Sequence, residues 1–184
     1  MIYSTPAARE MSTMQRYRPQ LAFLFLLVLW YGTFDWVYRQ VPDQLLADRV
    51  YRWGINEVAA DIINALHSDA RVSVDAHRLV SPRATLEVVR GCDGSGLLFL
   101  LSAAVLAFSA SWRRKLVGLA AATAAVYVLN ELRIVALYFV LVSHPAWFVA
   151  LHASVIPMIV IAFNAMFYLW WTHWATTHNA DVAG

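Results

Sequence analysis

Four long apolar runs constrain the fold of this 184-residue chain more than any other feature. A helix of about 20 mostly apolar residues crosses the roughly 30 Å hydrocarbon core of a bilayer. The chain is 60% hydrophobic and 14% charged, against about 45–50% and about 25% in an ordinary soluble domain. We therefore predict an all-α integral membrane protein, a bundle of about four transmembrane helices over residues 19–38, 92–111, 116–142 and 147–171.

Basic residues near the ends of these runs predict how the bundle is oriented. Short loops rich in Lys and Arg stay on the cytoplasmic side of a membrane. Arg16 and Arg18 precede the first run, and Arg113, Arg114 and Lys115 separate the second from the third. We expect a multi-pass protein of the cytoplasmic (inner) cell membrane. Its cytoplasmic parts are then residues 1–18, 112–115 and 172–184, and its outer parts are residues 39–91 and 143–146.

The long outer segment, residues 39–91, is too polar to cross a membrane. Within residues 42–66, charged residues recur while apolar residues fall near helical spacing, which predicts an amphipathic helix. This helix could lie on the membrane surface or pack on the protein's own bundle. Residues 71–90 contain two short β-like runs around Ser81-Pro82, which predict a β-hairpin leading to Cys92.

Three residues with reactive or charged side chains fall in or beside the apolar runs. Arg133 lies inside the third run, where a charge costs about 3 kcal/mol on insertion scales. His152 lies early in the fourth run, and Cys92 opens the second run beside three glycines. Each has an ordinary structural explanation: a snorkelling or ion-paired arginine, a packed histidine, and a small buried thiol. The predicted topology nevertheless places all three at similar depth on the outer side, from three different spans.

A thiol, an imidazole and a guanidinium are the groups that acyl transfer needs. A thiolate attacks a carbonyl carbon, and the positive end of a helix starting near Cys92 favours that form, although Asp93 opposes it. The imidazole of His152 takes and returns protons near neutral pH. The guanidinium of Arg133 offers planar donors to a developing oxyanion. Asn130 lies one helical turn before Arg133 and shares its face.

At these residues the sequence resembles the exosortase/archaeosortase family of integral-membrane transpeptidases. The resemblance is carried by Cys92 before a Gly/Ser-rich run, by Asn130-Glu-Leu-Arg133 in the next span, and by His152 early in the last. It covers roughly residues 84–165. Two features depart from the family: Asp93 replaces the serine of its usual Cys-Ser-Gly motif, and the chain has fewer spans than many relatives, which is typical of a compact member.

The resemblance implies a protein-sorting enzyme. Cys92 would be the nucleophile that forms a thioester, His152 the general acid and base, and Arg133 the oxyanion donor, with Asn130 in support. The substrates would be exported proteins whose C-terminal signal consists of a short motif, a hydrophobic span and a basic cluster. The active site would face outward, the acceptor nucleophile is left open, and no metal or organic cofactor is implied.

Other functions are weighed against this one. The net charge of +2 is too small to indicate a nucleic-acid surface. A single cysteine excludes an internal disulfide and a multi-cysteine metal site, and it has no resolving partner for redox chemistry. No HExxH motif points to a metal-dependent hydrolase. The main alternative is a non-catalytic structural or binding membrane protein, in which Cys92→Ala would be silent. Hydrolysis and transfer would use the same residues, so both stay open.

Overall fold

The computed structural model describes residues 6–177 of the chain and the side chains of residues 17–177. It is mostly helical, with one small antiparallel sheet. The ends of the predicted tails, residues 1–5 and 178–184, lie outside the described residues. Residues 6–18, predicted as a tail, form the start of helix α1 (Pro6–Gln40). Extending a helix costs much less than nucleating one, so the apolar run carries the helix upstream.

Three helical segments are long and apolar enough to cross a membrane: Tyr17–Gln40, Trp112–Ser143 and Pro145–Thr177. The first belongs to α1 and the second is helix α5. The third joins three pieces, which are α6 (Pro145–Ala150), η3 (Leu151–Val155) and α7 (Ile156–Thr177).

The remaining predicted span is the shorter helix α4 (Ser95–Ala107). Its 13 residues extend about 20 Å, less than the roughly 30 Å of the hydrocarbon core. Among the described residues, the bundle thus has three helices of spanning length and one shorter apolar helix, where four similar spans were expected. Helix α4 begins at Ser95 and not at Cys92 because Gly94, at φ 81°, has left the helical region of backbone angles.

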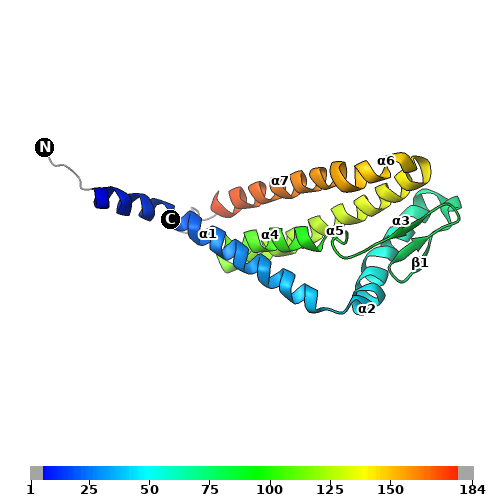
Figure 1. The fold of residues 1–184 in the computed structure, drawn as a ribbon, viewed down its shortest axis with the longest axis horizontal. Coiled ribbons are helices and arrows are strands. Elements are labelled where there is room, and N and C mark those ends of the chain that lie inside the picture. Colours follow the sequence, from blue (N-terminus) through cyan, green and yellow to red (C-terminus); the bar gives the residue numbers. More distant parts are fainter. Residues whose placement is uncertain (1–5, 178–184) are drawn as a thin grey trace.

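The helices run side by side (Figure 1), with α1 along α4 and with α5 against both α4 and α7. The start of α1 and the end of α7 lie at one end of this bundle, and α3 and the sheet lie at the other. At the first end, Lys115 Nζ donates to the carbonyl of Leu106 at 2.6 Å, and Arg114 Nη1 donates to that of Ala175 at 2.8 Å. Both carbonyls belong to the C-terminal turn of a helix, where cations are favoured.

Residues 43–66 form one helical segment at the opposite end of the bundle. It consists of α2 (Asp43–Leu45), the π-helical η1 (Leu46–Asn56) and α3 (Glu57–Leu66). Its apolar face joins one buried cluster with the C-terminal part of α5, and this cluster includes Tyr51, Ile55, Ala59, Ile63, Ile134 and Tyr138. The amphipathic segment therefore packs on the protein's own bundle, which is the second arrangement that the sequence allowed.

The predicted hairpin over residues 71–90 is a three-stranded antiparallel sheet, so that prediction was too simple. After the short turn η2 (Ser68–Ala70) come β1 (Ser73–Asp75), β2 (Arg78–Val80) and β3 (Thr85–Glu87), in the order β1-β2-β3. The extra reversal occurs at Ala76, whose φ is 51°. Alanine seldom adopts positive φ, and neither Gly nor Asn marks this turn, so turn chemistry did not predict it.

Candidate active site

Cys92 lies on a tight turn between the sheet and α4. The backbone N–H of Cys92 donates to the carbonyl of Val89 at 2.9 Å. Gly91 and Gly94 flank it at φ 90° and 81°, angles that glycine adopts without strain. The thiol is half-buried, so the turn presents it at the end of α4 instead of burying it in a core.

His152 brings its imidazole to this thiol from the other side of the bundle. The distance from Cys92 Sγ to His152 Nε2 is 3.7 Å. His152 lies in η3, a π-helical turn that ends just before Pro157. Proline lacks an N–H and crowds the carbonyl four residues earlier, and wide π-turns of this kind are frequent at functional sites.

The His152 ring is held mainly by stacking. Phe148, one helical turn earlier, lies parallel to it, with centroids 5.4 Å apart and 7° between the ring planes. His152 Nδ1 is buried and has no hydrogen-bond partner among the residues that the structure describes. The orientation of the imidazole therefore depends on Phe148 and on the contact with Cys92.

Arg133 and Asn130 approach the same place from α5. The guanidinium of Arg133 is close enough for its charge to act on His152, and its Nε is buried without a partner within residues 17–177. Asn130 is buried against the Cys92 turn, since a Cβ added to Gly94 would lie 3.1 Å from Asn130 Cγ. The structure thus brings His152 to Cys92 and Asn130 to the Cys92 turn, with the Arg133 charge acting on His152.

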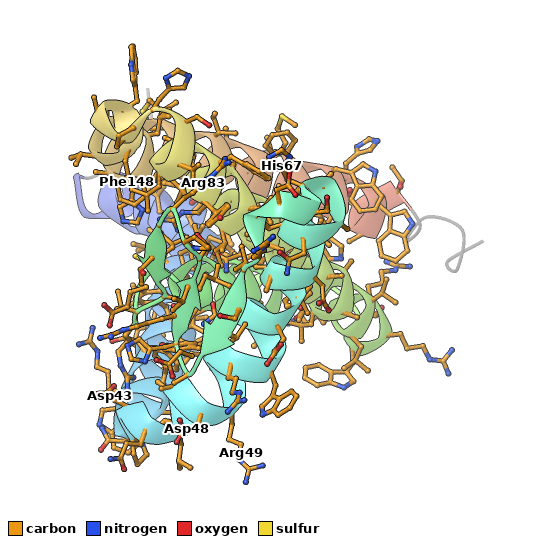
Figure 2. All side chains as sticks on the ribbon, turned by 90° about the vertical axis from the view of Figure 1, so that its right-hand side faces the viewer. Asp43, Asp48, Arg49, His67, Arg83 and Phe148 are labelled. Carbon is orange, nitrogen blue, oxygen red and sulfur yellow. The ribbon has the colours of Figure 1, made fainter. Side chains whose placement is uncertain are left out.

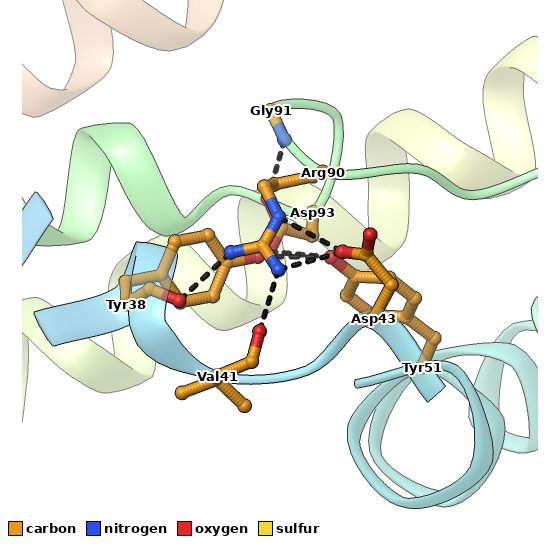
Figure 3. A network of polar contacts seen from close by, with 7 residues as sticks. All are labelled: Tyr38, Val41, Asp43, Tyr51, Arg90, Gly91 and Asp93. Atoms are coloured by element: carbon orange, nitrogen blue, oxygen red, sulfur yellow. Dashed lines mark hydrogen bonds and ion pairs between the residues drawn. The ribbon is translucent and has the colours of Figure 1, made fainter. Parts of the chain in front are cut away.

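Asp93 is a site residue whose partners the sequence did not indicate (Figure 3). Its Oδ1 accepts hydrogen bonds from the Gly91 N–H at 3.2 Å and the Ser95 hydroxyl at 2.9 Å. Its Oδ2 accepts from the hydroxyl of Tyr38, on α1, and from that of Tyr51, on η1, the latter at 3.4 Å. The two tyrosine oxygens are 2.8 Å apart. Burial, together with the hydrogen bond to Tyr38, raises the pKa of Tyr51, so its hydroxyl stays a donor.

Arg90 fastens the same turn to the end of α1. Its guanidinium donates to the carbonyls of Tyr38 and Val41, both at 2.8 Å, and to Asp43 Oδ1 at 2.6 Å. It also lies over the Tyr38 ring, 4.6 Å from the centroid. The hydrogen bond to Asp43 raises the pKa of Arg90. Figure 3 shows these contacts beside those of Asp93. No sequence signal links residue 90 to residues 38–43, because the contact depends on how α1 crosses α4.

A groove of about 310 Å³ opens beside this turn. It is largely apolar, with Ile55, Leu98, Phe99 and Val126 among its lining residues, and its polar end is formed by Asp93 and Asn130. Viewed onto this end of the bundle (Figure 2), Asp43 and Arg49 lie toward one edge of the end face, and Arg83 lies near Phe148 toward the opposite edge. Within the described part of the chain, no group of three or more His, Cys, Asp or Glu side chains could hold a metal ion.

The arrangement can support nucleophilic chemistry at a thiol. The imidazole is placed to accept the thiol proton, and a guanidinium lies in range of the same centre. A family model described as transmembrane exosortase matches residues 6–171 of the chain. No match was found among curated proteins or among solved structures.

Proposed function

This chain belongs to the transmembrane exosortase family, as its sequence motifs indicated, and we propose that it is a membrane cysteine transpeptidase or protease that cuts the C-terminal sorting signals of exported proteins. The observation that carries the proposal is the 3.7 Å separation of Cys92 Sγ and His152 Nε2. A thiol from the turn before α4 and an imidazole from η3 meet at one end of the bundle, next to a largely apolar groove.

The reaction divides into two acyl transfers at Cys92. His152 Nε2 takes the thiol proton, and the thiolate attacks the scissile carbonyl carbon of the substrate. The tetrahedral oxyanion is stabilised by the guanidinium of Arg133, with Asn130 in support. As the C–N bond breaks, protonated His152 gives its proton to the leaving amine, and a thioester to Cys92 remains. His152 then deprotonates the acceptor nucleophile, whose attack releases the thiolate and forms the product.

The topology follows from the same proposal. The substrate signal contains its own membrane span, so its cleavage site emerges at the surface of the bilayer. We place the Cys92 end of the bundle outside the cytoplasmic membrane and the first turn of α5, which carries Arg113, Arg114 and Lys115, inside. No metal or organic cofactor takes part in these steps.

Labelling of the single cysteine tests this orientation directly. A membrane-impermeant maleimide added to intact spheroplasts should label Cys92. The matched control carries Ser111→Cys in a Cys92→Ala background, since Ser111 lies in the connection at the opposite end of the bundle. That control should label only after permeabilisation. The reverse pattern would overturn the proposed orientation.

Cleavage of a candidate substrate tests the chemistry. An exported protein from the same genome, ending in a motif, a hydrophobic span and a basic cluster, is tagged ahead of the motif and expressed with this chain. We expect a product shortened by the signal. Added hydroxylamine should compete with the natural acceptor and leave a hydroxamate at the new C-terminus, because it captures a thioester.

Paired variants identify the residues responsible. Cys92→Ala and His152→Ala should abolish cleavage, whereas His173→Ala, an imidazole lost from the far part of α7, should not. Arg133→Lys should lower the rate, whereas Arg113→Lys should not. If Cys92→Ala cleaves as well as the unaltered protein, the catalytic proposal fails and the non-catalytic alternative takes its place.

A further inference from the structure

Asp93 bonds to its own turn and to two other segments at once. One carboxylate oxygen receives the Gly91 N–H and the Ser95 hydroxyl, on either side of Cys92. The other receives the hydroxyls of Tyr38 and Tyr51. A carboxylate accepts several hydrogen bonds on two oxygens, and bonds to an ionised acceptor are about twice as strong as neutral ones. Asp93 therefore joins the nucleophile's turn to α1 and η1.

The two tyrosines form an ordered relay of donors. The single hydroxyl proton of Tyr38 goes to Asp93, so the 2.8 Å contact between the tyrosine oxygens is donated by Tyr51, whose proton is shared between the Tyr38 oxygen and, at 3.4 Å, Asp93 Oδ2. Tyr51 is 4% exposed and lies in the buried cluster beneath the sheet. The Tyr51 hydroxyl is therefore held in place by the core of the outer segment. It fixes the Tyr38 hydroxyl by a hydrogen bond, and the Tyr38 hydroxyl in turn fixes the carboxylate of Asp93.

Two further contacts hold the Cys92 turn, one on each side of the cysteine. Gly91 and Gly94, both at positive φ, flank the cysteine without side chains to pack. Arg90 fastens the turn upstream of Cys92, and Asn130 abuts it at Gly94. Of the three residues that hold the turn, Arg90, Asn130 and Asp93, only Asp93 is the immediate chain neighbour of Cys92.

We propose that Asp93, with the hydroxyls of Tyr38 and Tyr51, is a positioning group that fixes Cys92 Sγ at its distance from His152; this inference rests on the proposed function. Asp93 contacts neither reacting atom, so its effect passes through the geometry of the turn. A misplacement of about 1 Å between reacting groups lowers rates by on the order of 100-fold.

The test uses the full-length protein with the hydroxyls removed and the rings retained. Tyr38→Phe/Tyr51→Phe is compared with Tyr31→Phe, a tyrosine of α1 outside this network. Asp93→Ser and Asp93→Asn are also made. Serine has one oxygen in place of the two carboxylate oxygens, whereas asparagine keeps the shape of the aspartate side chain without its charge. The first readout is the rate of Cys92 alkylation by N-ethylmaleimide across pH, which needs no substrate. The second is the kcat and KM of cleavage.

We expect the alkylation profile of the double tyrosine variant to move toward that of His152→Ala, since both changes uncouple thiol from imidazole. We expect kcat to fall between about 10- and 100-fold, a larger change than that in KM, which also shifts because Tyr38 and Asp93 line the groove. Asp93→Ser should behave like the double variant, Asp93→Asn should recover part of the loss, and Tyr31→Phe should match the unaltered protein. A purely structural role would lower the yield of folded protein without shifting the pH profile.

The outcomes separate this inference from the proposed function. If His152→Ala leaves the alkylation profile unchanged, Cys92 and His152 are not coupled and the proposed function fails. If His152→Ala shifts the profile but the double tyrosine variant does not, the positioning role alone fails. Should the double variant not fold, Tyr51→Phe and Asp93→Asn decide the same point singly, and an unchanged profile in both would overturn the inference.

Discussion

Replacing Phe148 should disturb His152, the proposed general base, without altering Cys92, the proposed nucleophile. The Phe148 and His152 rings lie parallel, with centroids 5.4 Å apart, and His152 Nδ1 has no partner among the described residues to hold the imidazole instead. Aromatic pairs contribute about 0.5–1.5 kcal/mol beyond the area they bury. If that energy maintains the reactive orientation, Phe148→Ala lowers kcat by about two- to twelvefold, at about 1.4 kcal/mol per tenfold change in rate.

The assay compares Phe148→Ala with Phe148→Tyr in the cleavage reaction and in the pH profile of Cys92 alkylation. Tyrosine keeps the stacking ring, so we expect Phe148→Tyr to retain nearly full activity. The alanine variant should lose kcat with little change in KM, because Phe148 belongs to α6 and does not line the groove beside the Cys92 turn. Equal kcat values for alanine and tyrosine, in well-folded samples, would refute the claim that stacking orients His152.

Three further predictions concern the turn, the bundle and the alkaline limit of stability. Gly94→Ala should abolish most activity, because φ 81° strains an alanine and its Cβ meets Asn130 at 3.1 Å, whereas Gly96→Ala, with nothing within 4 Å, should be active. Gly118→Ala should lower the free energy of unfolding by about 1–3 kcal/mol, because the added Cβ would lie 2.4 Å from Trp171 Nε1. Gly32→Ala is the control, since a Cβ at Gly32 has nothing within 4 Å. Thermal unfolding in detergent measures both variants. The raised pKa of Tyr51 means that the folded state holds this proton more tightly than the unfolded chain, so its stabilising effect is complete below pH 10.0 and declines as pH rises further. Tyr51→Phe should therefore reduce the loss of stability above pH 10, and an unchanged alkaline unfolding curve would contradict this assignment.

Much of the fold could be predicted because hydrophobicity and helical periodicity are local properties. The apolar runs predicted a helical membrane protein, and three of them are helices of spanning length. The second run predicts a full span, but glycines at 91 and 94 delay its helix until Ser95. The sequence predicts a hairpin instead of three strands because the reversal at Ala76 uses a residue that seldom marks such turns.

The catalytic candidates were also visible in the sequence, for a chemical reason. Cys92, Arg133 and His152 are rare residue types in an apolar setting, where each is costly or reactive enough to be noticed alone. Their predicted membrane depth follows from helix length and basic flanks, both of which can be read in the sequence. The contact between Cys92 and His152 is consistent with that reasoning.

The residues that hold the site were decided by the tertiary structure. Asp93 departs from the family motif, and its role depends on Tyr38 and Tyr51, which reach it because α1 packs along α4 and because η1 brings the Tyr51 hydroxyl to that of Tyr38. In the sequence Phe148 is one apolar residue among many, and only the structure shows that the π-turn at η3 stacks His152 against it. A hydrogen bond between distant segments forms only when the helices that carry its donor and acceptor are positioned relative to each other to within about 1 Å. The positions and crossing angles of packed helices are set by side-chain packing across the whole bundle, and not by the composition of any one segment.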